Sequence, residues 1–281
     1  MSFQNNIFFL KVRDYSVSKE IFELHHNPEY DFLITFPKPS LEKLPNYYES
    51  EDYISHTDGK RSLFERMYHL IKNIALKNKL KLINAQSPKG KLLDIGAGTG
   101  DFLVIAKNDG WQATGIEPNV KAKVIAINKG VSFVDNLSDL ESQSFDVITM
   151  WHVLEHVPNL DEYIKELKRL VKPKGTILIA VPNFKSFDAN YYGRFWAAFD
   201  VPRHIWHFSK TAIQKLFTEK EMKMVEVLPM KFDSFYVSLL SEKYKTGKMN
   251  LIRAFFVGLK SNLKGKKTKE FSSHIYIIKN K

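Results

Sequence analysis

The sequence contains no cysteine among its 281 residues. This absence excludes a disulfide scaffold, a thiolate nucleophile, and any zinc or iron–sulfur site with cysteine ligands. It fits a reducing compartment, and we expect a cytoplasmic location. No apolar run approaches the roughly 18–20 residues that a membrane-spanning helix needs. The first residues, MSFQNNIFFLKVRD, have no basic segment before their short apolar run, so no signal peptide is predicted.

Acidic residues are scarce towards the end of the sequence. The formal net charge is +11, to which residues 1–60 contribute −4, residues 61–240 contribute +6 and residues 241–281 contribute +9. This uneven distribution disfavours a nucleic-acid-binding surface. It favours a solvated basic tail, with an anionic substrate or a peripheral membrane contact through this C-terminal region as the alternatives. The sequence carries no signal for the oligomeric state.

Hydrophobic residues make up 44% of the chain and charged residues 26%, as in ordinary soluble globular proteins. Residues 7–36 alternate short apolar and polar runs, which predicts a small antiparallel sheet. Prolines at positions 37, 39 and 45 then mark a linker. We therefore expect an N-terminal β module and linker in residues 1–60. A second domain would span residues 61–281 and begin with an amphipathic helix that reaches about residue 85.

Strands and helices alternate from residue 91 onward. Short apolar runs predict strands at residues 91–95, 112–116, 131–134, 145–151, 176–181, 222–228 and 274–278. Helical spacing separates most of them, for example in residues 160–171 and 211–219. This alternation predicts an α/β fold with a doubly wound, seven-stranded and mostly parallel sheet.

The most informative local pattern is a glycine loop, LLDIGAGTGD, in residues 92–101. A buried strand runs into Gly96, Gly98 and Gly100, and a helix begins near Asp101. Glycine allows the backbone to turn with positive φ and to approach a ligand closely. At the end of the next strand stands Glu117, where a carboxylate can accept hydrogen bonds from both hydroxyls of a ribose. The pattern predicts a nucleotide-type site at the carboxyl ends of the strands.

Two kinds of cofactor compete for this loop. A dinucleotide fold requires Gly-x-Gly-x-x-Gly, with the pyrophosphate at the helix N-terminus. Here the spacing is Gly-x-Gly-x-Gly, and the sixth position is Asp101, whose carboxylate would repel a pyrophosphate. Asp94, which precedes the loop, is suited to an ammonium or a sulfonium. The residues therefore favour a cationic cofactor over a dinucleotide.

At this point the sequence resembles the class I S-adenosylmethionine-dependent methyltransferases over about residues 82–217. LLDIGAGTG matches their first motif, TGIEPN their second, and FDVITMWHVLEHVPN their fourth strand and the segment after it. The resemblance implies a Rossmann-like fold with S-adenosylmethionine as the cofactor. The cofactor-contacting residues that it implies are Asp94, Gly96, Ala97, Gly98, Gly100, Asp101, Glu117, Pro118, Asn136, Leu137, Met150, Trp151 and His152.

The resemblance also assigns these residues to parts of the cofactor. Asp94 and the backbone of residues 96–100 would surround the methionine portion, and Glu117 would bind the ribose. Pro118, Asn136 and Leu137 would flank the adenine, with Asp135 as a partner for its amino group. Residues 150–152 would line the methionine end.

Two histidines, His152 and His156, lie four residues apart. This spacing can hold a metal ion on a helix, but the pattern is not His-Glu-x-x-His, because Glu155 adjoins the second histidine. No further ligand accompanies them in the sequence, so we predict no metal site.

Residues 182–208 are rich in aromatic side chains and are expected to form a long insertion on the substrate side. Nine of these 27 residues are aromatic, and the segment ends with DVPRHIWHF. His204 or His207 is our candidate for a general base, since imidazole titrates near neutral pH. Arg203 is a candidate for holding an anionic group. Alternatively, these residues pin a lid over the sheet edge, with Arg203 paired to Asp200. A similar DxPRHxxHFS segment occurs in methyltransferases linked with glycan or lipid-like metabolites.

A second insertion is expected at about residues 230–271. Residues 250–259 are apolar apart from Arg253, and five lysines follow up to residue 269. The segment is either an apolar lid with a basic rim or a helical cover over the core.

The N-terminal region resembles a module that carries a cysteine-based zinc knuckle in related methyltransferases. YYESEDYISH in residues 47–56 matches the segment that follows the knuckle, while the cysteines are missing. The resemblance therefore implies a metal-free β module. Tyr47, Tyr53 and His56 would either close over the cofactor or pack structurally.

These observations predict an S-adenosylmethionine-dependent methyltransferase that acts on a small-molecule, glycan or lipid-like acceptor. An RNA methyltransferase is an alternative, although residues 150–153 lack the Asn/Asp-Pro-Pro-Tyr/Phe motif of amino-methylating enzymes. A non-catalytic S-adenosylmethionine-binding partner protein is another, and a dehydrogenase is the weakest.

Overall fold

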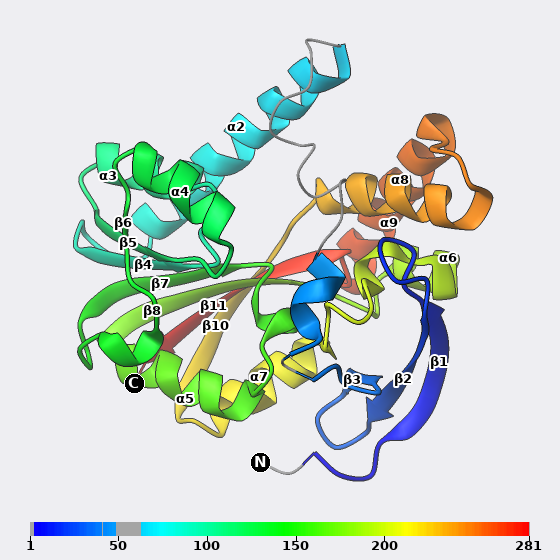
Figure 1. The fold of residues 1–281 in the computed structure, drawn as a ribbon, viewed down its shortest axis with the longest axis horizontal. Coiled ribbons are helices and arrows are strands. Elements are labelled where there is room, and N and C mark those ends of the chain that lie inside the picture. The colour runs from blue at the N-terminus through cyan, green and yellow to red at the C-terminus, as the bar shows by residue number, and fades with distance from the viewer. Residues whose placement is uncertain (1–2, 41, 49–62, 281) are drawn as a thin grey trace.

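The computed structural model describes residues 3–40, 42–48 and 63–280, and its centre is a seven-stranded sheet (Figure 1). The strand order is β10-β11-β8-β7-β4-β5-β6. Neighbours are parallel from β8 to β6, whereas β11 is antiparallel to both β8 and β10. The predicted doubly wound, mostly parallel α/β fold is confirmed. The strands are β4 (Lys91–Ile95), β5 (Gln112–Ile116), β6 (Ser132–Phe133), β7 (Phe145–Trp151), β8 (Val171–Pro182), β10 (Met222–Pro229) and β11 (Ser273–Asn280).

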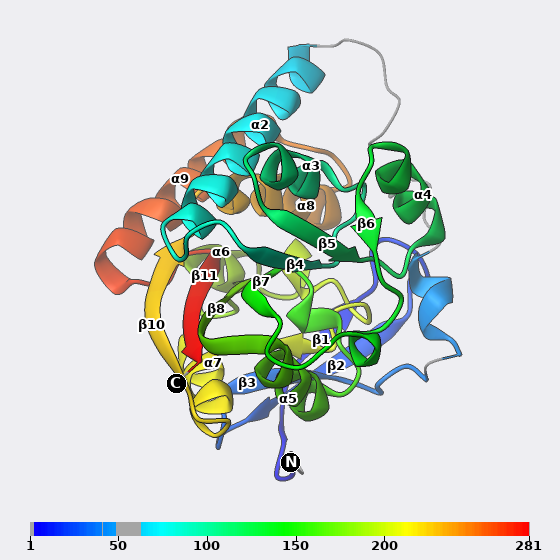
Figure 2. The same cartoon turned by 90° about the vertical axis from the view of Figure 1, so that its left-hand side faces the viewer.

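Helices cover both faces of this sheet (Figures 1 and 2). On one face lie α2 (Leu63–Asn84), α3 (Asp101–Asn108) and α4 (Val120–Asn128), and on the other lie α5 (Leu160–Leu170) and α7 (Lys210–Thr218). A strand with both faces covered must be apolar along its length. This explains why residues 177–181 of β8 are fully buried in succession, with side chains that pack alternately into the two apolar layers.

The N-terminal residues form the small antiparallel sheet that was predicted. It consists of β1 (Ile7–Arg13), β2 (Ile21–Asn27) and β3 (Phe32–Phe36), followed by the 3₁₀ turn η1 (Leu44–Tyr48). A fourth strand that the sequence did not predict, β9 (Trp206–His207), pairs with β3. The N-terminal sheet is thus completed by a segment that follows it by 170 residues. The predicted boundary at residue 60 lies outside the described residues.

The aromatic insertion at 182–208 is built from short helical elements. It contains α6 (Phe187–Tyr192) and the 3₁₀ turns η4 (Gly193–Phe195) and η5 (Ala197–Phe199). Most of its large side chains are buried, and several pack against apolar residues of β1, β2 and β3, which fixes the segment against the N-terminal sheet. The second insertion forms two helices, α8 (Asp233–Thr246) and α9 (Leu251–Thr268). Two further 3₁₀ turns, η2 (Leu137–Asp139) and η3 (Leu154–His156), flank β7.

A buried carboxylate joins the two insertions. Asp188 of α6 is 0% exposed. Its side chain accepts hydrogen bonds from Trp196 Nε1 at 2.8 Å, Ser261 Oγ of α9 at 2.6 Å and Ser272 Oγ at 2.7 Å. A buried charge is tolerated only where donors satisfy it, so this residue fixes α9 against α6.

Replacing Asp188 by alanine should lower the free energy of unfolding by roughly 3–5 kcal/mol, because three buried donors lose their acceptor. Urea denaturation followed by circular dichroism measures the change. The control is Asp135→Ala, at a side chain that is 77% exposed; there we expect a change within about 0.5 kcal/mol. Equal effects in the two variants would contradict the structural role of Asp188.

Candidate active site

The glycine loop lies at the carboxyl end of β4, in the place that open parallel sheets use for ligands. Gly96, Gly98 and Gly100 have φ of +73°, +53° and +76°, and α3 begins directly after them. The amides of Gly96 and Ala97 donate to the carbonyl of Ile116, which holds the loop against β5. A Cβ on Gly98 would meet no described atom within 4 Å, whereas one on Gly96 would lie 2.4 Å from Val153. The open side of the loop is therefore at Gly98.

Glu117 stands at the end of β5 and faces this open side. Its Oε2 accepts a hydrogen bond from the Gly98 amide and its Oε1 accepts one from the Asn119 amide, both at 2.8 Å. Each carboxylate oxygen keeps a further lone pair. The side chain is held in place by the loop itself and can still accept two hydroxyl donors. Pro118, which follows it, is exposed.

Asp94 is the buried carboxylate of the site, only 2% exposed at the end of β4. Thr149 Oγ1 donates to it at 2.6 Å. Burial raises the pKa of Asp94 to about 7, although the Thr149 hydrogen bond and the charge of Lys79 act in the opposite direction. A cationic ligand at this point would relieve the cost of the buried charge.

Lys79 of α2 is a residue of this site that the sequence analysis missed. Its ammonium lies 4.4 Å from the centre of the Trp151 ring, and burial lowers the pKa of Lys79 despite the charges of Asp94 and Asp233. In the sequence it is one of four lysines between residues 72 and 81, all on the same helix. Helical periodicity did not indicate which of them faces the glycine loop.

The remaining predicted cofactor residues differ in their surroundings. Asp101 forms ion pairs with Lys72 and Lys129, each at 2.6 Å, so its charge is compensated by two lysines. Asn136 and Leu137 form the start of η2, as part of a capping turn closed by Asp139. Asp135, predicted beside the adenine, is paired with Lys123.

The predicted methionine-side residues occupy the carboxyl end of β7. Met150 is fully buried, and Trp151 is 9% exposed with an indole Nε1 that has no hydrogen-bond partner among the described residues. His152 adopts a left-handed conformation, with φ of 59°. Its ring lies 3.3 Å from Glu155 Oε1 and 3.1 Å from Asp233 Oδ2. His152 thereby links the sheet edge to α8.

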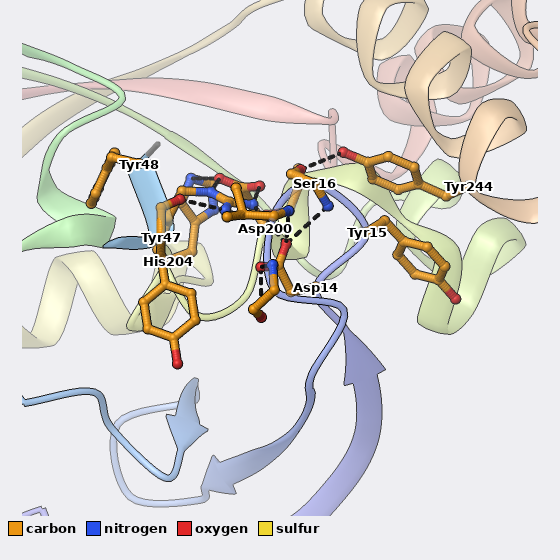
Figure 3. A network of polar contacts seen from close by, with 12 residues as sticks. Asp14, Tyr15, Ser16, Tyr47, Tyr48, Asp200, His204 and Tyr244 are labelled. Carbon is orange, nitrogen blue, oxygen red and sulfur yellow. Dashed lines mark hydrogen bonds and ion pairs between the residues drawn. The ribbon is translucent and has the colours of Figure 1, made fainter. Parts of the chain in front are cut away.

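Arg203 forms a buried polar network between the aromatic insertion and the N-terminal sheet (Figure 3). It donates to both carboxylate oxygens of Asp200, at 2.9 and 2.6 Å, and to the carbonyl of Tyr47 at 2.8 Å. Asp14 lies 3.3 Å away on the other side and is held by amides of the turn after β1. The guanidinium is engaged on all sides, which matches the alternative of a pinned segment with Arg203 paired to Asp200. The proposed grip of Arg203 on an anionic group stays a prediction.

The two candidate bases lie within this pinned segment. His204 Nδ1 is 2.9 Å from the carbonyl of Ala198. His207 Nε2 is 3.0 Å from Thr35 Oγ1, and that hydroxyl donates to the carbonyl of His204. Burial and the neighbouring His204 lower the pKa of His207 well below its usual value. A low pKa makes His207 a weak base, and the catalytic role of either residue stays a prediction.

A third imidazole, which was not a predicted site residue, faces His204. The ring centroids of His156 and His204 are 4.5 Å apart. His156 Nδ1 lies 3.0 Å from the Tyr48 hydroxyl, so η1 reaches this position. The hydroxyl of Tyr47 donates instead to Glu20. Tyr53 and His56, also expected near the cofactor, lie outside the described residues.

Comparison with known proteins identifies the family. The model of a family described as "Methyltransferase domain" matches residues 63–227. A ubiquinone biosynthesis O-methyltransferase from Pectobacterium atrosepticum is 27% identical over 173 residues, which is 56% of this chain and 70% of that protein. One from Yersinia pestis is 32% identical over 103 residues, covering 33% of this chain and 43% of that protein. The chain thus spans less than half the length of the Yersinia relative.

Solved structures share the fold. An S-adenosylmethionine-dependent methyltransferase from Archaeoglobus fulgidus is 17% identical, with a TM-score of 0.53 over 74% of this chain and 94% of that one. A geranyl diphosphate C-methyltransferase from Streptomyces coelicolor is 14% identical, with a TM-score of 0.55 over 81% of this chain and 84% of that one.

Within the described residues, no helix combines the length and the apolar character needed to cross a membrane. The family match spans more than half of the chain and contains the glycine loop, Glu117 and the histidines of the β7 edge. The chain therefore belongs to the methyltransferase-domain family and is an S-adenosylmethionine-dependent methyltransferase.

Proposed function

We propose that this protein transfers a methyl group from S-adenosylmethionine to an oxygen of a small, amphipathic acceptor. The proposal rests on the position of the Glu117 carboxylate. It accepts a hydrogen bond from the Gly98 amide beside the open side of the glycine loop. The cofactor supplies an electrophilic methyl group on a cationic sulfur. The relatives named above as ubiquinone biosynthesis O-methyltransferases support an acceptor with a hydroxyl group and an apolar part.

The residues of the loop fit the cofactor in charge and in shape. Gly98 leaves space where a side chain would block the ligand, and Glu117 offers lone pairs to the ribose hydroxyls. Asp94 is suited to the ammonium or sulfonium, and Lys79 to the carboxylate of the methionine portion. A cofactor bound in this way would have its sulfonium near the β7 edge, where His152 contacts Asp233 of α8. Catalysis is then largely a matter of positioning the acceptor oxygen against the methyl group.

The proposed activity is tested by incubating the protein with S-adenosylmethionine labelled in the methyl group and fractions of a cell extract. We expect label in a small-molecule fraction, with loss of labelling in Glu117→Ala because the ribose contacts are lost. Calorimetry with S-adenosylhomocysteine, with NAD as the control ligand, measures cofactor binding separately. Label in RNA would instead support the RNA methyltransferase, and tight binding without any labelling would support the non-catalytic partner protein.

The buried carboxylate of Asp94 predicts a pH dependence of cofactor binding. Its pKa is raised to about 7, and the charged groups facing it are Lys79 and Glu117. Below that pH Asp94 becomes neutral and loses its attraction for a cation. We expect the affinity for S-adenosylmethionine to fall as the pH is lowered from 8 to 6, by up to about tenfold for each unit below the pKa. Asp94→Asn should bind weakly and with little pH dependence, and an unchanged pH profile in that variant would refute the role of Asp94.

We also propose that α9 touches an anionic membrane surface during acceptor delivery. Along α9, Ile252, Phe255, Phe256 and Leu263 are between 53% and 73% exposed. The same helix carries five basic and no acidic residues. An amphipathic helix with this composition suits the interface of a membrane that contains anionic lipids.

Vesicle co-sedimentation tests the proposed membrane contact. The wild-type protein should bind vesicles that contain phosphatidylglycerol more strongly than vesicles of phosphatidylcholine. Ile252→Glu with Phe256→Glu should reduce binding to the anionic vesicles, because it places two charges in the apolar contact. The matched control, Val124→Glu, changes an exposed apolar residue of α4 that is 51% exposed. Equal binding by the two variants would contradict a membrane contact through α9.

A further inference from the structure

Three polar side chains lie close together where η3 meets the aromatic insertion, which we call the acceptor side of the site. Glu155 and His156 belong to η3, and His204 belongs to the aromatic insertion. One ligand atom from each of them lies within 4.8 Å of the other two. Glu155 and His204 are buried, whereas His156 is partly exposed, so one side of the cluster is accessible. This cluster differs from the His152–His156 pair that was considered in the sequence.

The fold brings these residues together by backbone hydrogen bonding. The amide of Ile205, next to His204, donates to the carbonyl of Glu155 at 2.8 Å. On the other side of His204, Arg203 is held in place by its hydrogen bonds to Asp200 and to the carbonyl of Tyr47. The positions of the three side chains are thus set by the main chain and by buried ion pairs on either side of the cluster.

Both imidazoles point Nδ1 at a backbone carbonyl. His156 Nδ1 lies 3.0 Å from the carbonyl of Arg203, and His204 Nδ1 lies 2.9 Å from the carbonyl of Ala198. A carbonyl oxygen only accepts hydrogen bonds, so each Nδ1 donates and Nε2 is the nitrogen that can bind a cation. Nε2 of His204 also lies 3.9 Å from Asp200 Oδ2. A ring that donates Nδ1–H to a carbonyl while Nε2 stays free is the usual arrangement of a metal-binding histidine.

The carboxylate of Glu155 is buried without adequate donors. Its side chain is 1% exposed, and neither oxygen has a hydrogen-bond partner among the described residues. The nearest cation is His152, whose Nδ1 lies 3.3 Å from Oε1 and whose ring is shared with Asp233. An ionised carboxylate in such a place carries a large desolvation penalty unless a cation compensates it. His152 compensates this charge on one side, and a cation between Glu155 and the two imidazoles would compensate it on the other.

We propose that Glu155, His156 and His204 bind a divalent transition-metal ion such as Zn²⁺. Two imidazole nitrogens and one carboxylate form a donor set that suits these ions, and three protein ligands leave at least one coordination position open. We further assign that position to the acceptor oxygen, a role that rests on the proposed function. Acting as a metal ligand, His204 would not serve as a free base. The metal-bound hydroxyl of the acceptor would instead release its proton to water, and its oxygen would form the bond to the methyl carbon as the sulfur–carbon bond of the cofactor breaks.

Metal titration of the full-length protein tests the site without any acceptor. Protein stripped with a chelator is titrated with Co²⁺, and the visible absorption of the bound ion is recorded; Zn²⁺ is titrated by calorimetry. We expect one ion per chain. Glu155→Gln and His204→Ala should each weaken binding by roughly 100-fold or more, because removing a ligand costs at least as much as removing an outer-shell partner.

A matched control is provided by His25, which pairs with Glu23 at 2.9 Å on the N-terminal sheet. His25→Ala removes another histidine beside a glutamate and should leave Co²⁺ binding unchanged. Circular dichroism and thermal unfolding show whether each variant is folded. Wild-type protein that binds no stoichiometric ion, or Glu155→Gln that binds as tightly as wild type, would overturn the metal site.

The acceptor role is tested by comparing methyl transfer by the metal-free and the reloaded protein. We expect transfer to fall on stripping and to return with Zn²⁺ or Co²⁺. Transfer that is equally fast without metal would overturn the acceptor role while leaving the methyltransferase activity intact. Failure of the methyltransferase proposal has a different signature, because labelling would then be absent at every metal concentration.

Discussion

The buried guanidinium of Arg203 is the interaction on which the acceptor side of this protein depends. A charge that is 7% exposed cannot remain in the interior without partners. Its partners come from the turn after β1, from η1 and from the aromatic insertion. Because the charge must be satisfied by all three, the N-terminal segment and the insertion are fixed to each other, and His204 is fixed next to them.

This constraint explains why the N-terminal sheet cannot be considered apart from the methyltransferase fold. Strand β9 completes that sheet, and its neighbours in the chain include Arg203 and His204. The amide of Ile205 also reaches the 3₁₀ turn at the β7 edge. The acceptor side is therefore built from three distant stretches of the chain. Substitutions in the N-terminal sheet are expected to shift the positions of side chains at the β7 edge.

The cofactor side is organised differently, because it is built almost entirely from local sequence. The glycines turn the chain between β4 and α3, and Glu117 caps the loop through the Gly98 amide. Lys79 comes from α2, which precedes the loop, and residues 150–152 come from the end of β7. The two halves of the site meet at His152, whose ring links Glu155 to Asp233 of α8.

The sequence by itself determined the sheet, its alternating helices, the glycine loop and the cofactor. These features are written in short-range patterns: apolar periodicity, glycines at turns and a carboxylate at the end of a strand. Only the tertiary structure decided that the guanidinium of Arg203 binds both Asp200 and Asp14. It also decided that Lys79 lies over the Trp151 ring. The contact of Glu155 and His156 with His204 likewise appears only in the folded chain. Such contacts depend on burial and on which groups compensate a charge, and residues far apart in the chain satisfy them only after folding.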